Sequence, residues 1–124
     1  MAHDDLTIDL HPENDGHTLV FKLSGSFDLA TSPPVRAALT DAMDKGKQEL
    51  IVDLSHVEFL DSTGLGALIG AQRRATEGNG SIRLIVNEGP IMRLLNITGL
   101  IRVLAVYPNL EDALAKRNRI ESAL

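Results

Sequence analysis

Short apolar segments with a two-residue period alternate along this chain with longer segments in which apolar residues recur at helical spacing. Strands are predicted at residues 6–10, 17–23, 49–54, 82–86 and 103–107, and helices at residues 32–46, 63–77, 90–98 and from 109 onward. Strands that alternate with helices form βαβ units with right-handed crossovers. The order therefore predicts an α/β fold in which helices pack on a mostly parallel or mixed sheet.

Capping residues set the expected helix boundaries. Ser32 followed by Pro33 is typical of an N-cap with proline in the first turn, and Gly99 is a natural stop for the third helix. Asn109 is expected to cap the final helix, whose late basic residues, Lys116, Arg117 and Arg119, complement its dipole. The side chains expected to face the core from that helix are Leu110, Ala113, Leu114 and the stem of Arg117.

Length and charge narrow the possible functions. A chain of 124 residues is long enough for one compact core and too short for two ordinary domains. It contains no cysteine, which excludes thiolate metal sites and cysteine nucleophiles. A net charge of −5 with 3% aromatic residues argues against nucleic acid as a partner. Without a secretory signal or a long apolar run, the protein is expected in the cytoplasm and not in a membrane.

The most distinctive segment runs from Asp53 to Gly66 and joins a buried strand to a helix. Ser62 lies where that helix begins, close to backbone N–H groups that lack intrahelical partners. A serine, threonine or aspartate at such a position is commonly just an N-cap, so Asp61, Ser62 and Thr63 all have this structural explanation. The alternative is that the Ser62 hydroxyl is the reacting group of a regulatory site.

Two glycines favour the functional interpretation of this helix. Gly66 and Gly70 are four residues apart, and each costs about 1 kcal/mol relative to alanine in an exposed helix interior. Together with Ser62 they form a stripe almost free of side chains that ends at Arg73, because residues at these spacings lie on one face. Either another protein's backbone approaches this stripe, or the glycines pack tightly on the chain's own sheet. The sequence supports both equally.

Other chemistries fit the sequence less well. The segment lacks the first glycine of a Gly-x-Ser-x-Gly nucleophile elbow, and all four histidines precede Ser62, whereas that fold places its catalytic histidine after the serine. The glycines from Gly64 to Gly70 depart from the dinucleotide fingerprint, so nucleotide binding remains a minor alternative. The histidines have no metal-ligand spacing. We therefore predict no enzyme activity, no metal and no cofactor.

Three segments together resemble a known family. The run Val52-Asp-Leu-Ser-His-Val-Glu-Phe-Leu-Asp-Ser-Thr-Gly-Leu-Gly66 closely resembles the defining motif of bacterial anti-anti-sigma factors of the STAS superfamily. Gly25-Ser-Phe-Asp28 is similar to the family's Gly-x-aliphatic-Asp element, with Phe27 in the aliphatic position, and Asn96-Ile-Thr-Gly-Leu100 is similar to its Thr/Ser-Gly-Leu motif. The resemblance implies a single STAS domain over residues 1–124, with a core of about residues 5–116. Its sheet would be mixed, with four or five strands, and flanked by about four helices.

The resemblance also implies a mechanism. In this family, the unphosphorylated protein binds an anti-sigma factor that is a serine kinase, and a sigma factor is thereby released. The kinase inactivates the antagonist by phosphorylating it, and a serine phosphatase restores it. Relatives with the same domain also serve as subunits of larger signalling complexes or bind nucleotides, and these remain alternatives.

The resemblance makes Ser62 the phosphoacceptor, with Thr63 as the first substitute. The residues expected to bind the partner, from the resemblance and from the glycine stripe, are Asp28, Asp61, Ser62, Thr63, Gly64, Gly66, Gly70 and Arg73. The protein is expected to be a monomer or a weak dimer.

Overall fold

The protein is built on a five-stranded mixed sheet. The computed structural model describes residues 5–116. The strands are β1 (Leu6–Pro12), β2 (Thr18–Phe27), β3 (Glu49–Leu60), β4 (Ser81–Ile85) and β5 (Ala105–Tyr107), and they lie in the sheet in chain order. Strand β1 runs antiparallel to β2, and the other neighbours are parallel. The predicted mixed sheet is confirmed, with β1 supplying its antiparallel edge.

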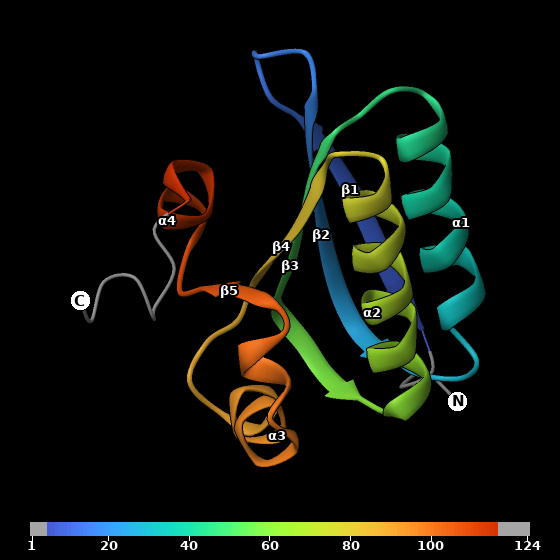
Figure 1. Cartoon of the computed structure of the whole chain (residues 1–124). Coiled ribbons are helices and arrows are strands. Elements are labelled where there is room, and N and C mark those ends of the chain that lie inside the picture. Colours follow the sequence, from blue (N-terminus) through green and yellow to red (C-terminus); the bar gives the residue numbers. More distant parts are fainter. Residues whose placement is uncertain (1–4, 117–124) are drawn as a thin grey trace.

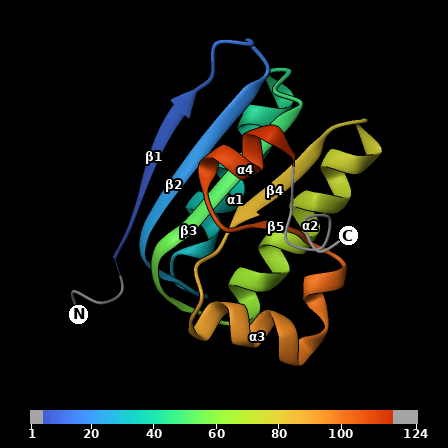
Figure 2. The same ribbon diagram turned by 90° about the vertical axis from the view of Figure 1, so that its left-hand side faces the viewer.

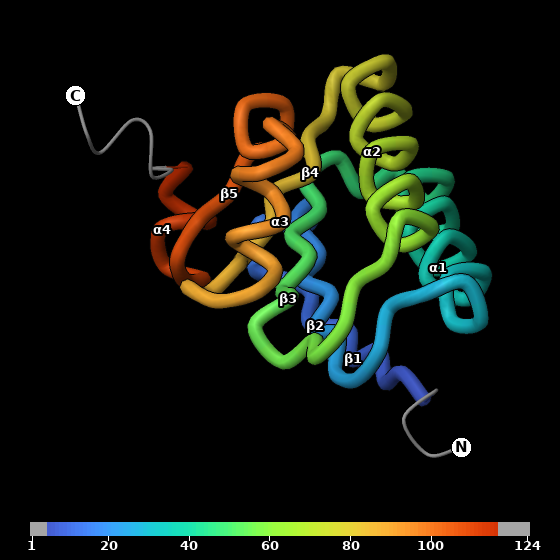
Figure 3. The backbone as a smooth tube through the Cα atoms, turned by 90° about the horizontal axis from the view of Figure 1, so that it is seen from below, coloured from blue at the N-terminus to red at the C-terminus, as the bar shows by residue number. Residues whose placement is uncertain are grey.

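Helices cover the two faces of the sheet unequally (Figures 1 and 2). The helices are α1 (Ser32–Asp44), α2 (Ser62–Glu77), α3 (Pro90–Thr98) and α4 (Leu110–Ala115), with a short 3₁₀ turn, η2 (Leu100–Arg102), after α3. Helices α1 and α2 lie side by side on one face, α3 crosses the end where α2 begins, and α4 lies on the opposite face (Figures 2 and 3). The main core fills the space between the sheet and α1, α2 and α3.

Strand and helix boundaries differ from the expectations in places. Strand β3 continues to Leu60 instead of ending at Leu54, and β2 continues to Phe27, because both remain paired beyond two register shifts. These shifts break the simple alternation of apolar residues, and for this reason the strands predicted from the sequence end too early. The last strand begins at Ala105 and not at Val103, since the residues just before it form η2 and a turn.

The expected caps are right for one helix and wrong for another. The Asn109 side chain accepts a hydrogen bond from the Asp112 N–H at 2.8 Å, so the predicted cap of α4 is confirmed. Helix α1 is preceded by Thr31 as its N-cap, and Ser32 lies inside the helix with its Oγ accepting from Arg36 Nε at 3.2 Å. The prediction for Ser32 was therefore wrong by one residue.

A buried arginine that the sequence did not suggest pairs with a glutamate of the sheet and holds helix α4 through a hydrogen bond. Arg83, on β4, is 3% exposed, and its Nη2 donates to Glu49 Oε1 at 2.7 Å while its Nη1 donates to the Ala113 carbonyl. Ala113 is buried, but Leu110 and Leu114 are more than a third exposed, contrary to expectation. A helix of 6 residues presents little surface to the sheet. The side chain of Arg117 and the charge of Arg119 lie outside the described residues.

Candidate functional site

Ser62 is the first residue of α2 and is exposed. The cap of this helix is the preceding residue, Asp61, which has an extended backbone and accepts a hydrogen bond at Oδ1 from the Gly64 N–H at 2.9 Å. Of the three capping candidates in the sequence, Asp61 therefore performs this role. The Ser62 hydroxyl is left at the surface, at the head of the helix, where a second protein can reach it.

The Asp61 carboxylate also joins two loops. Its Oδ2 accepts a hydrogen bond from the Leu29 N–H at 3.1 Å, and the Asp61 N–H donates to the Phe27 carbonyl at 3.3 Å. One side chain thus caps α2 and attaches the loop between β2 and α1 to the loop that carries Ser62. We conclude that Asp61 fixes the geometry around Ser62.

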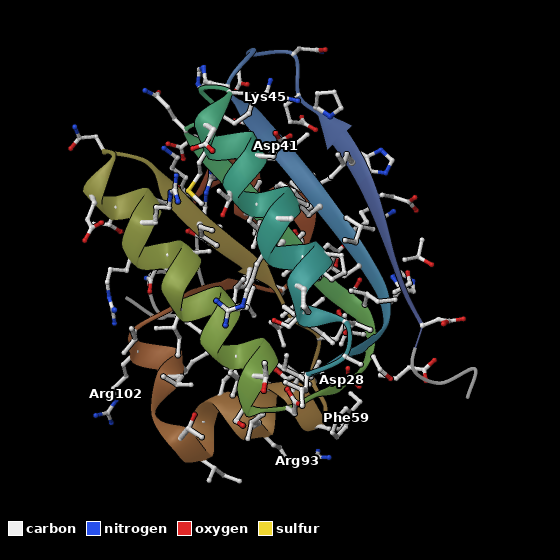
Figure 4. All side chains as sticks on the ribbon, turned by 90° about the vertical axis from the view of Figure 1, so that its right-hand side faces the viewer. Asp28, Asp41, Lys45, Phe59, Arg93 and Arg102 are labelled. Carbon is white, nitrogen blue, oxygen red and sulfur yellow. The ribbon has the colours of Figure 1, made fainter. Side chains whose placement is uncertain are left out.

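Asp28 shapes the neighbouring loop from within. Its Oδ1 accepts hydrogen bonds from the backbone N–H groups of Ala30 at 3.0 Å and Thr31 at 3.2 Å, and its own N–H donates to Thr31 Oγ1 at 2.9 Å. This pattern is an Asx-type turn, which explains the choice of aspartate on local grounds. Figure 4 shows Asp28 beside the start of α2. The structure therefore brings Asp28 and Ser62 to the same end of the molecule.

Two exposed apolar side chains at this end were missed by the sequence reasoning. Leu29 is 73% exposed and follows Asp28 in the loop, while Phe59 is 54% exposed near the end of β3. Figure 4 places Phe59 and Arg93, from α3, around the end of the molecule where α2 begins. Phe59 could have been found, because it falls on the side of β3 opposite to the buried Leu60.

Gly64 has a structural role that differs from the expectation. It is buried, and a Cβ atom built on it would lie 2.7 Å from the Phe27 carbonyl oxygen and 2.7 Å from Leu60 Cδ1. Only glycine lets the start of α2 pack this closely on the ends of β2 and β3. Phe27, which departs from the family's aliphatic residue, is fully buried and fills the space next to Gly64. Gly64 therefore does not belong with the exposed residues of the site.

Gly66 and Gly70 face solvent instead. A Cβ atom built on either glycine would meet no other atom within 4 Å, so neither packs on the chain's own sheet. That alternative, which the sequence left open, is wrong. Ser62, Gly66, Gly70 and Arg73 are all exposed on one side of α2, and Thr63 is half-buried beside them. We call the four exposed residues the glycine stripe.

The part of the chain that the structure describes contains neither a cluster of metal-binding side chains nor a helix that could span a membrane. Within residues 5–116, no three histidine, aspartate or glutamate side chains come close enough together to hold a metal ion. Over the same residues, none of the helices combines the length and the apolar character needed to cross a bilayer.

Comparison with known proteins agrees with this fold and motif. The model of the STAS domain family matches residues 10–113. An anti-sigma F factor antagonist of Paenibacillus polymyxa is 28% identical over 112 residues, which cover 90% of this chain and 96% of that relative. The match extends over most of the chain, and the chain belongs to the STAS domain family.

Solved structures extend the comparison to three dimensions. The crystal structure of an anti-sigma factor antagonist from Mycobacterium paratuberculosis has a TM-score of 0.82 at 28% identity, with 90% of this chain and 93% of that chain covered. The Bacillus cell fate determinant SpoIIAA in its phosphorylated form has a TM-score of 0.69 at 25% identity, with coverages of 89% and 98%. The five-stranded sheet and its helices are therefore those of STAS proteins.

Proposed function

We propose that this chain is an anti-sigma factor antagonist whose binding to an anti-sigma factor serine kinase is switched by phosphorylation of Ser62. The unphosphorylated protein binds the kinase and releases a sigma factor, and a serine phosphatase reverses the inactivation. Relatives over most of the chain carry the name anti-sigma factor antagonist, and SpoIIAA exists in a phosphorylated form. The observation that carries the proposal is the exposed Ser62 hydroxyl at the head of the glycine stripe.

A phosphate on Ser62 changes the surface more than the fold. It adds a charge of about −1.5 to −2 beside the Asp61 carboxylate, and it adds bulk where the stripe has none. The N-terminus of α2 tolerates the anion, because its N–H groups and dipole favour negative charge. The antagonist should thus stay folded after modification while a partner seated on the stripe is expelled by volume and charge.

The site needs no catalytic group of its own. A serine that serves as a kinase substrate must be accessible, and the kinase supplies the base and the nucleotide. The histidine nearest to Ser62 in the sequence, His56, pairs its Nδ1 with the Ser55 hydroxyl at 3.2 Å. The protein would thus act by binding and not by catalysis. Because its target is a regulator of transcription, we expect it in the cytoplasm.

The test begins with the full chain and each candidate anti-sigma kinase of its host. Incubation with ATP followed by mass spectrometry should place one phosphate on Ser62, and Ser62→Ala should take up none while still binding the kinase. Ser62→Asp should bind poorly. Thr63→Ala is the matched control, because it removes the neighbouring hydroxyl. Unchanged phosphate incorporation in Ser62→Ala would show that the site assignment is wrong.

Nucleotide binding by the turn from Gly64 to Gly70 is the alternative from the sequence. Residues 64–70 lie inside α2, the Gly64 N–H already donates to Asp61, and Gly64 is buried against Phe27, so this segment is not a glycine-rich loop that wraps a nucleotide phosphate. Calorimetry with ATP and GTP and no partner distinguishes the two functions. A role as a subunit of a larger signalling complex would instead show as stable binding that Ser62→Asp does not weaken.

A further inference from the structure

Strand β1 forms an open edge of the sheet. Within residues 5–116, no strand pairs with β1 on the side away from β2. Figures 2 and 4 show β1 at the margin of the fold, clear of α1. An open edge presents unpaired N–H and C=O groups, to which another strand can add. The edge at β1 is therefore a potential binding surface that lies apart from the helix carrying Ser62.

The β1 edge has few of the features that keep edge strands apart. Such features include lysine side chains, β-bulges, proline and short length. Strand β1 is 7 residues long, its sequence LTIDLHP contains neither lysine nor arginine, and its register against β2 has no shift. Its proline, Pro12, is the last residue, and Leu10 is 52% exposed. A regular, partly apolar edge of this kind is suited to strand pairing.

The hydrogen bonds at the two ends of β1 show which main-chain groups point outward. The Asp5 carbonyl accepts from the Ser26 N–H at 3.3 Å, and the Glu13 N–H donates to the Thr18 carbonyl at 2.9 Å. In an antiparallel ladder such bonds recur at every second residue, so the odd-numbered residues of β1 point their main-chain groups toward β2. The groups that point away from the sheet belong to Leu6, Ile8 and Leu10.

The side chains of β1 divide between the two faces of the sheet. Leu6 and Ile8 pack against the main core on the helix side, and Leu10 lies on the same face because side chains alternate along a strand. The exposed residues on the other face are Asp5, Thr7, Asp9 and His11. A strand that joins this edge therefore meets an apolar row on one face and a polar row on the other.

The geometry points to a second copy of this chain as the occupant, with the two β1 strands antiparallel about a two-fold axis at Ile8. In this arrangement Ile8 lies opposite its own equivalent, and Leu6 lies opposite Leu10 of the second copy. These residues have outward-pointing main-chain groups, so they form the hydrogen-bonded pairs of the new ladder. The interface is isologous, and the sheets of the two copies join into one continuous sheet.

The polar row of β1 is complementary to itself in this register. Asp5 lies opposite His11 of the second copy, where the imidazole N–H donates to the carboxylate. Thr7 lies opposite Asp9 of the second copy, where the hydroxyl donates to the carboxylate. These are the non-hydrogen-bonded positions of the ladder, at which opposite side chains come closest. This complementarity favours a second copy over an unrelated strand.

The neighbouring registers bring like charges together. Because outward groups alternate along β1, the partner of each residue changes in steps of two, which moves the two-fold axis by one residue. With the axis at Thr7, Asp5 would lie opposite Asp9. With the axis at Asp9, the two Asp9 carboxylates would meet, and Pro12, which has no N–H, would lie opposite Leu6. Like charges directly opposite destabilise strand pairing, and the proposed register avoids them.

Pairing through β1 leaves the start of α2 accessible. Figure 4 shows α1 between α2 and β1 on the helix side of the sheet. Both copies therefore keep an exposed Ser62, and the inference does not rest on the proposed function. Phosphorylation of Ser62 should accordingly leave the dimer unchanged.

Sedimentation equilibrium at concentrations up to about 0.5 mM tests the dimer, because an interface formed by one strand is small and small interfaces bind weakly. Wild type should show a monomer–dimer equilibrium. Leu10→Lys should raise the dimer Kd by about tenfold or more, since lysine replaces an apolar side chain opposite Leu6.

Val103→Lys is the matched control for Leu10→Lys. Val103 is 54% exposed, against 52% for Leu10, and it lies in the turn before β5, the strand at the other edge of the sheet. The substitution makes the same change in net charge and should leave the dimer Kd unchanged. Urea denaturation should show that both variants are folded, because each replaced side chain is more than half exposed.

A charge exchange tests the register. His11→Asp places a carboxylate opposite Asp5 of the second copy, and it should raise the dimer Kd by about tenfold because the contact occurs twice by symmetry. Adding Asp5→His to His11→Asp restores opposite partners and should return the Kd to the wild-type value. Only a register that pairs residues 5 and 11 predicts this recovery.

Hydrogen exchange measured by NMR gives a readout at single residues. The amides of Thr7 and Asp9 point toward β2 and should be protected at every protein concentration. The amides of Ile8 and Leu10 point outward, and they should become protected only at concentrations at which the dimer forms.

The outcomes separate this inference from the proposed function. A wild-type chain that stays monomeric at about 0.5 mM would overturn the dimer and leave the Ser62 switch standing. A dimer in which the Ile8 and Leu10 amides still exchange freely, or which Leu10→Lys does not weaken, would also overturn it. Failure of every host anti-sigma kinase to bind would contradict the proposed function and would not affect the dimer.

Discussion

The sheet beneath α4 and the outer face of α2 use the same residue types in opposite ways. Beneath α4, Arg83 is 3% exposed and has its guanidinium bound by Glu49 and by the Ala113 carbonyl. On α2, Arg73 is exposed and has no ion pair within the described residues. The glycines divide likewise, since Gly64 is enclosed and Gly66 is open. Arg83 is buried and bound through both terminal nitrogens, although its Nε has no hydrogen-bond partner, whereas Arg73 and Gly66 are exposed and accessible to another molecule.

The largest loss of stability is expected when the buried Arg83–Glu49 pair is broken. Among the described residues, Arg83→Met leaves the Glu49 carboxylate, which is 18% exposed, with the Ser81 hydroxyl and with Lys116 at 3.7 Å. Breaking a buried pair costs about 3–5 kcal/mol, so the free energy of unfolding should fall by about 3 kcal/mol because Glu49 keeps these partners. Urea denaturation measures this loss. Replacing both residues, Arg83→Met with Glu49→Met, should recover most of it, and a double variant as unstable as the single would contradict this account.

Gly64→Ala should produce the next largest effect. Its Cβ would lie 2.7 Å from the Phe27 carbonyl oxygen, which is backbone and cannot turn aside as a side chain does. Overpacking of this kind costs about 1–3 kcal/mol, which outweighs the better helix propensity of alanine. Thermal and urea denaturation should both show the loss. Wild-type stability in Gly64→Ala would mean that α2 does not pack on β2 and β3 as described.

Gly66→Ala and Gly70→Ala should change stability in the opposite direction. Neither position has a neighbour within 4 Å of the new Cβ, so each substitution should raise the free energy of unfolding by up to about 1 kcal/mol. If the glycines are kept for a partner, these more stable variants should bind the kinase less well. A gain in stability with unchanged kinase binding would show that Gly66 and Gly70 do not lie in the interface with the kinase.

The smallest effect is expected in the turn between β1 and β2, at the opposite end of the molecule from the start of α2 (Figure 1). A hydrogen bond from the Thr18 hydroxyl, with a further one from the His17 N–H, lowers the pKa of Asp15 from 3.8 to about 2. The stabilisation is present above pH 3.8 and is lost as the pH falls toward 2. Thr18→Val should move the pKa of Asp15 back up in an NMR titration, without any effect on kinase binding.

Much of this architecture could be predicted from the sequence because apolar periodicity reports burial directly. The order of strands and helices and the place of Ser62 at a helix start followed from that signal. The sequence analysis left the direction of the glycines open, although Leu65 and Leu68 mark the buried side of α2 and at 100° per residue Gly66 falls on the other side.

Other features depend on contacts between distant segments. The ends of β2 and β3 depend on register shifts, and the Arg83–Glu49 pair joins two strands that only the fold brings together. The Leu29 N–H donates to Asp61, which is 32 residues away in the sequence. Local sequence patterns contain no information on such pairings. A hollow between α1 and α2 escaped prediction for the same reason, because Arg36 and Gly70, which both line it, lie on different helices.

The most direct measurement compares the affinity of the kinase for two forms of the same chain, one carrying phosphate on Ser62 and one without it. Calorimetry or biolayer interferometry should give a Kd at least about a hundredfold higher for the phosphorylated form, and treatment with a serine phosphatase should restore the original value. Equal affinity of the two forms, with the phosphate verified on Ser62 by mass spectrometry, would contradict the account.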